Sequence, residues 1–91
     1  MSDHEGGTVR HAHGGAEWDI PVDLLESQRR FDEANAAATA ATEQDAMDAA
    51  RGRMQAAALE INRHPWLEEH RVAGRRFQAD TAMKNLARSA G

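Results

Sequence analysis

The stretch ANAAATAATEQDAMDAA, residues 34–50, contains a change in the apolar face of the predicted helix. This change sets the expected arrangement of the helices. Upstream, one narrow apolar stripe recurs at helical spacing and consists of Leu24, Phe31, Ala34, Ala38 and Ala41. Continued without a break, this stripe would land on Asp45, Asp48 and Gly52, which are not core residues. A second stripe lies two positions out of step, about 200° around a helix, and consists of Met47, Ala50, Met54, Ala57 and Ile61. The displacement predicts a break in the helix between the two stripes.

The segment from Thr42 to Asp45 fits a capping box at this break, because Thr42 can accept an amide hydrogen bond and Asp45 can reach back. We therefore expect one helix over residues 21–41 and a second over residues 43–62, folded as an antiparallel helical hairpin. One continuous helix over residues 22–63 stays open as the alternative. The expected turn contains no Gly, Pro or Asn, and Ala is the best helix former.

Pro65 begins a third predicted helix, since proline suits the first helical turn and disfavours a helical conformation at His64. We expect this helix to span residues 65–88. By contrast, residues 1–17 contain four Gly and three His with no apolar period, which predicts a disordered tail. The expected fold class is therefore all-α. A single domain over residues 18–91 holds an antiparallel helical hairpin and a third, C-terminal helix, in a small bundle completed by self-association.

The apolar inventory predicts a thin core. Hydrophobic residues make up 41% of the chain, but 19 of them are Ala. Burial of apolar surface stabilises a fold by roughly 25 cal/mol per Å², so each Ala contributes little. We therefore expect a homodimer or a complex with another protein.

Composition also excludes several classes of protein. The chain has no Cys, which rules out a disulfide framework, a thiolate zinc site and a cysteine nucleophile. No apolar run is long enough for a membrane span, and the first residues lack the pattern of a signal peptide. We expect a cytoplasmic protein that does not interact with membranes.

Charge is distributed unevenly along the chain. Residues 1–50 hold 3 Arg against 11 Asp and Glu, a net charge of −8, whereas residues 51–91 hold 8 Lys and Arg against 4 acids, a net charge of +4. The favoured interpretation is that acidic and basic helices of the same chain pack against each other. The alternative is that the basic end meets an acidic partner.

Three short motifs carry a resemblance: Asp19 to Leu25, His64-Pro65-Trp66, and Met83 to Arg88. On these motifs, residues 18–90 resemble small actinobacterial helical proteins with a His-Pro-Trp corner. The resemblance implies a helical hairpin, a corner and a basic last helix, and it implies no activity. This chain has Leu67 where such relatives would carry a second aromatic residue, which argues against an aromatic binding platform.

No enzymatic motif is present: the chain lacks a nucleophile elbow, a glycine-rich phosphate loop and a His-Glu-x-x-His pattern. We expect no catalytic residues, no cofactor and no small-molecule substrate. Metal ligands are not expected either, with one hypothesis left open. After removal of Met1, the sequence Ser2-Asp3-His4 could form a square-planar site for Cu(II) or Ni(II), to which His11 and His13 could add imidazoles.

The C-terminal helix offers the remaining functional signal. The favoured interpretation of Trp18 and Trp66 is structural: these large side chains cap the ends of a core poor in bulk. Aromatic residues flanked by Arg at a helix corner are also typical of interface anchors, and the candidate interface residues are Trp66, Arg71, Arg75 and Phe77. The predicted function is a non-enzymatic helical module for protein–protein interaction, working as a homodimer. The alternative is a small accessory or regulatory nucleic-acid-binding protein that uses the basic C-terminal helix. A whole-chain pI near 5.7 argues against general nucleic-acid binding.

Overall fold

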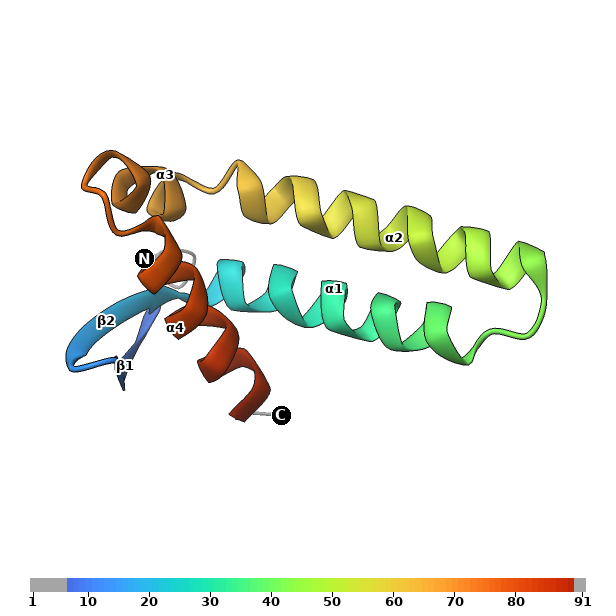
Figure 1. The fold of residues 1–91 in the computed structure, drawn as a ribbon, viewed down its shortest axis with the longest axis horizontal. Helices are drawn as coiled ribbons and strands as arrows, with labels where there is room; N and C mark the ends of the chain where they lie inside the picture. Colours follow the sequence, from blue (N-terminus) through green and yellow to red (C-terminus); the bar gives the residue numbers. More distant parts are fainter. Residues whose placement is uncertain (1–6, 90–91) are drawn as a thin grey trace.

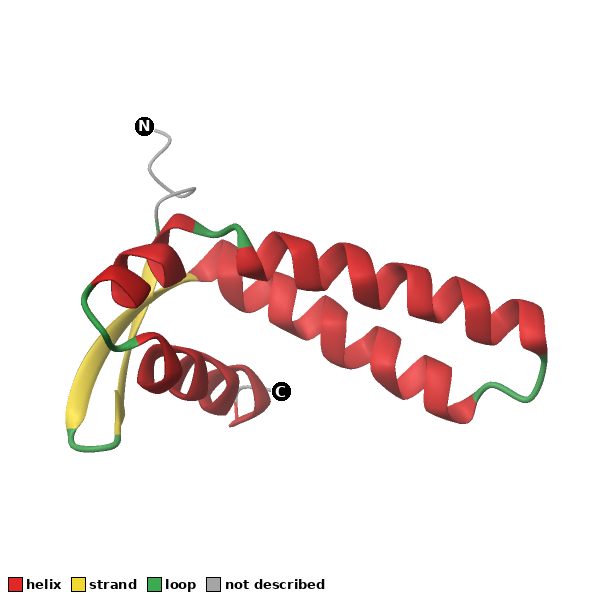
Figure 2. Cartoon of the chain, turned by 45° about the horizontal axis from the view of Figure 1, so that its top comes forward, coloured by secondary structure: helices red, strands yellow, loops and turns green. Residues whose placement is uncertain are grey.

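The computed structural model describes residues 7–89, which form a compact head and a long projecting arm (Figure 1). The elements follow in the order β1 (Thr8–His13), β2 (Ala16–Pro21), α1 (Val22–Ala40), α2 (Gln44–Asn62), α3 (Pro65–Val72) and α4 (Arg76–Ser89). Figure 2 shows the two strands at one end of the molecule, beside α3 and α4, and the paired helices α1 and α2 extending away from them.

The predicted all-α fold is wrong, because residues 8–21 form a two-stranded antiparallel sheet. His13 pairs with Ala16, so Gly14 and Gly15 alone make the turn. Their φ angles of 63° and 81° are both positive, as a tight type I′ hairpin turn requires. The same residues overturn the predicted disordered tail from Gly7 onward, while residues 1–6 lie outside the described part. The fold is therefore α+β, and the predicted helical hairpin with a third helix does not describe the whole of it, because the sheet comes first.

α1 and α2 pack side by side as antiparallel helices, which together we call the arm. The chain leaves the helix at Ala41, with φ −69° and ψ 135°, so residues 22–63 are not one continuous helix. The predicted capping box does not form: Glu43 is the N-cap residue of α2, and no side chain caps it. The break between α1 and α2 therefore forms without a side-chain cap.

The single helix predicted over residues 65–88 is also wrong. Gly74, with φ 78°, divides it into α3 and α4. The amide of Gly74 donates to the carbonyl of Arg71 at 3.1 Å, and the amide of Arg75 donates to the carbonyl of His70 at 2.7 Å. These two bonds form a Schellman motif, which ends a helix at a residue of left-handed conformation.

The core lies in the head, where the sheet, the start of α1, the end of α2, α3 and α4 meet. Ile20, Leu24, Leu67 and Met83 are its largest fully buried apolar side chains. Away from the head, the buried side chains of the arm are small: Ala34, Ala50 and Ala57. We call these three residues the alanine seam, and they lie where α1 packs on α2 of the same chain.

Within the described part of the chain, ion pairs do not neutralise the uneven charges of the two halves. Among residues 7–89, one pair of permanently charged groups joins the acidic half, residues 1–50, to the basic half, residues 51–91. It is Arg30 with Glu60, so the base belongs to the acidic half and the acid to the basic half. The other such pairs stay within one half: Arg10 with Glu17 and Asp19, Arg71 with Glu68, and Lys84 with Asp80. The favoured interpretation of the charge asymmetry therefore gains no support from ion pairs.

Candidate functional site

An aromatic cluster fastens the sheet to α3. Trp18 of β2 and Trp66 of α3 meet edge to face, with ring centroids 6.3 Å apart. The imidazole of His70 lies 5.3 Å from the ring of Trp18 and 4.5 Å from that of Trp66, again edge to face. Such geometry is favourable for aromatic rings beyond the area they bury. The cluster therefore joins β2 to α3 through three rings.

His70 is held in an environment that disfavours its charged form. Burial lowers its pKa below the ordinary value, the positive charge of Arg75 lowers it further, and Glu69 opposes the shift. Its Nδ1 atom is buried without a hydrogen-bond partner among the described residues. The charged form would place an unsatisfied N–H there, so the neutral ring suits this position.

A groove opens next to this cluster, between the β1–β2 turn and α4. Its volume is about 340 Å³, and its lining residues are His13, Gly14, Ala16, Trp18, Arg75, Phe77, Gln78 and Thr81. Trp18 is 8% exposed, whereas Phe77 is 78% exposed. A second hollow continues along α4 and adds Asp80, Lys84, Asn85 and Arg88 to His13, Phe77 and Thr81. We call these two hollows together the Phe77 groove.

The Phe77 groove carries positive charge. The hollow over Trp18 is lined by Arg75 and by no acidic residue. In the continuation, Asp80 is paired with Lys84 at 3.0 Å, which leaves Arg88 as a further cation. Within the described part of the chain, neither Arg75 nor Arg88 has an ion-pair partner. An aromatic side chain between two such guanidinium groups can bind an apolar group flanked by acids.

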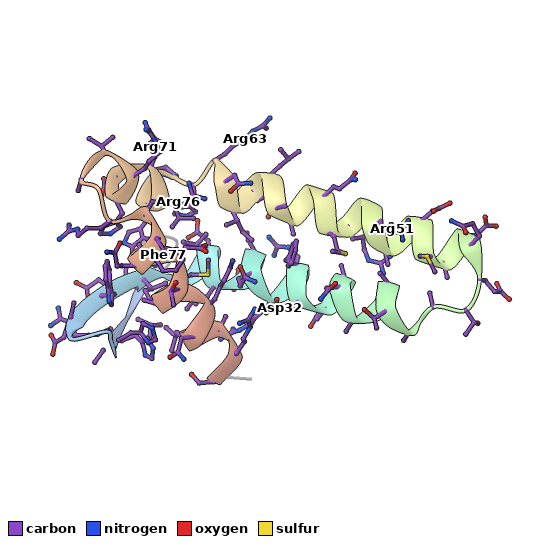
Figure 3. All side chains as sticks on the ribbon, in the orientation of Figure 1. Asp32, Arg51, Arg63, Arg71, Arg76 and Phe77 are labelled. Carbon is purple, nitrogen blue, oxygen red and sulfur yellow. The ribbon has the colours of Figure 1, made fainter. Side chains whose placement is uncertain are left out.

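The structure separates the four residues predicted as an interface. Arg75 and Phe77 line the groove, at the start of α4. Trp66 packs half-buried against the core and against Trp18. Arg71 points outward from α3 and binds Glu68, holding the pKa of that carboxyl below its ordinary value (Figure 3). The groove therefore takes two of the four residues and not the others.

Sequence reasoning missed the contribution of the N-terminal hairpin to the groove. His13, Ala16 and Trp18 lie on one face of the sheet, and the signal for them was present. Alternation of Val9, His11 and His13 before Gly14-Gly15, and of Ala16, Trp18 and Ile20 after it, is typical of a hairpin. β1 is fixed to α4 through His11, whose Nε2–H donates to Oδ1 of Asn85 at 2.8 Å.

Two further expectations concern metals and membranes. In residues 7–89, no three His, Asp or Glu side chains come together as a metal-binding group, although the rings of His11 and His13 stack. Ser2, Asp3 and His4 lie outside the described residues. None of the helices in the described part has the length and apolar character needed to cross a bilayer.

No family model, no curated protein and no solved structure matches this chain. The resemblance to actinobacterial proteins with a His-Pro-Trp corner therefore stays a prediction.

Proposed function

We propose that this protein is a non-enzymatic protein–protein interaction module that works as a homodimer, with the Phe77 groove in its interface. The observation that carries the proposal is the exposure of Phe77. The chain has only two Phe and two Trp residues, and three of these four pack in or against the core. Phe77 alone stands 78% exposed.

Energetics support an interface at this position. Covering a Phe side chain contributes about 2 kcal/mol, a large amount for a head whose core is this small. Large exposed aromatics beside a preformed hollow are typical of binding anchors. The remainder of an interface would come from the groove walls on the β1–β2 turn and α4.

The arm offers apolar surface as well. Met47, Met54 and Ala58 are half-buried and lie at helical spacing on α2. Because the alanine seam is already filled by α1, these side chains rather than the seam are available to a second copy.

Sedimentation velocity of the purified chain over a range of concentrations tests the proposal. We expect a dimer in the micromolar range, and we expect F77A to raise the dissociation constant at least about tenfold, the equivalent of 1.4 kcal/mol. L59A is the matched control, because Leu59 is 51% exposed on α2 and does not line the groove. A folded wild-type monomer at high micromolar concentration would contradict the proposal.

A second candidate function rests on the same groove. Phe77 stands beside Arg75 and Arg88, and an exposed aromatic ring among cations can stack a base while the cations neutralise phosphates. Fluorescence anisotropy of labelled single strands and duplexes at low salt tests nucleic-acid binding. The whole-chain net charge of −4 weighs against it, and we therefore rank it second.

A further inference from the structure

We propose that the occupant of the Phe77 groove is the acidic loop at the tip of the arm, residues 41–48, of a second copy of this chain. This inference rests on the homodimer proposed above and names the contact that would hold it together.

The loop has the charge that the groove lacks. Glu43, Asp45 and Asp48 give residues 41–48 a net charge of −3, with no Lys or Arg among them. All three acids are exposed, and Glu43 and Asp45 have no ion-pair partner in the described part of the chain. Residues 41–43 connect the two helices, and α2 begins at Gln44, so Glu43 is its N-cap residue and Asp45 and Asp48 stand on its first turns.

The loop also carries an apolar side chain between its acids. Met47 lies two residues after Asp45 and one before Asp48, and it is half-buried. A thioether contacts aromatic rings favourably, and the groove offers the rings of Phe77 and Trp18. Met47 against these rings, with Glu43 one helical turn before it and Asp48 next to it facing Arg75 and Arg88, would satisfy both the apolar and the charged parts of the groove.

One chain cannot make this contact with itself. The loop lies at the far end of the arm, and the groove lies in the head at the opposite end (Figures 1 and 2). The molecule extends 42 Å along its longest axis, and α2 meets α4 at its head end, where Oδ1 of Asn62 accepts from Arg76 at 2.9 Å. The two complementary surfaces can therefore meet only between copies.

A two-fold dimer lets both copies make the contact at once. If the arms run in opposite directions, each loop reaches the head of the other copy, and the assembly closes. Two symmetric contacts leave no free groove and no free loop. This arrangement accounts for the unneutralised charge asymmetry of the chain, since the acidic half of one copy lies on the basic half of the other.

Charge reversal on each side, measured by sedimentation velocity, tests the contact. We expect E43K/D45K alone and R75E/R88E alone to raise the dissociation constant at least about tenfold, because like charges then face each other. An equimolar mixture of the two variants should form a heterodimer near wild-type affinity, because every loop then meets a groove of opposite charge. R53E is the control, since Arg53 lies on the arm outside the Phe77 groove. Circular dichroism checks that each variant remains folded.

The outcomes are distinguishable. A wild-type dimer that neither double variant weakens, or a mixture that fails to recover the dimer, overturns the loop contact and leaves the homodimer standing. A wild-type monomer contradicts both proposals. Oligonucleotide binding that R75E/R88E abolishes, with the sedimentation of the protein unchanged, overturns the loop contact in favour of a nucleic-acid surface.

Discussion

Trp18 and Trp66 meet edge to face with their ring centroids 6.3 Å apart, and His70 lies against both rings. Trp18 comes from the hairpin at the start of the described chain, and Trp66 comes from the corner after the arm. The contact therefore joins β2 to α3. It also holds the imidazole of His70 in a partly buried position, where protonation of the ring affects stability.

We expect the protein to lose stability as the pH falls below about 6.5, the ordinary pKa of His. Burial lowers the pKa of His70 in the folded state, so the unfolded chain binds the proton more readily. The contribution of His70 to stability is fully present above its pKa in the unfolded chain. It is lost as the pH falls from that value to the lowered pKa of the folded state. Urea denaturation at pH 7.5 and pH 5.5 measures the difference. H70Q should show a smaller difference, and an equal one would contradict the prediction.

The His64 side chain caps α3 and should contribute about 1 kcal/mol to stability. Its Nδ1 accepts the amide of Trp66 at 3.1 Å, and its Nε2–H donates to Oδ1 of Asp23 at 3.0 Å. Through its two nitrogens the ring joins the first turn of α3 to the first turn of α1. H64A should lower the free energy of unfolding, whereas H64N, which keeps a capping acceptor, should recover most of the loss. Equal losses in both variants would show that capping is not the cause.

The β1–β2 turn should respond in opposite directions to two adjacent substitutions. Among the described residues, no atom lies within 4 Å of an added Cβ at Gly14 or Gly15, so the backbone conformation sets the effect of each substitution. Asn tolerates the left-handed region and favours the first position of a type I′ turn, so G14N should stabilise by about 0.5 kcal/mol. G15A should destabilise by about 1 kcal/mol, because Ala disfavours positive φ. Thermal unfolding of both variants measures the pair, and a destabilised G14N would argue against this turn type.

Gln28 is a buried polar residue whose replacement by Met should stabilise the protein by about 1 kcal/mol. It is 1% exposed, its Nε2 donates to Asp32 at 3.0 Å, and its Oε1 is buried without a partner among residues 7–89. Met fills a similar volume and removes the unsatisfied acceptor.

S27A is the control, because the buried Ser27 hydroxyl donates to Glu60 at 2.9 Å and accepts from Arg30. We expect S27A to lower the urea midpoint where Q28M raises it. The prediction fails if both lower it equally.

Local sequence signals were enough to predict where helical segments form and where some of them end. Pro65 begins α3 because proline suits a first helical turn, and the displaced stripes led to two helices that separate at residues 41–43. These are local effects of propensity and periodicity, which a single chain segment carries. Arg75 and Phe77 could be selected in the same way, from an aromatic residue and a cation two residues apart.

Tertiary structure decided the rest. A two-stranded sheet is marginal alone, and β1 and β2 hold because Trp18 and Ile20 are buried against helices far along the chain. Side chains alternate around Gly14 and Gly15 as in a hairpin, but few of them are apolar, so the pattern alone does not predict a sheet. The strands are stable because the helices complete the core around Trp18 and Ile20. The division at Gly74 and the exposure of Phe77 likewise depend on how α4 packs. The groove exists only because the hairpin turn and α4 come together, which no local pattern in the sequence specifies.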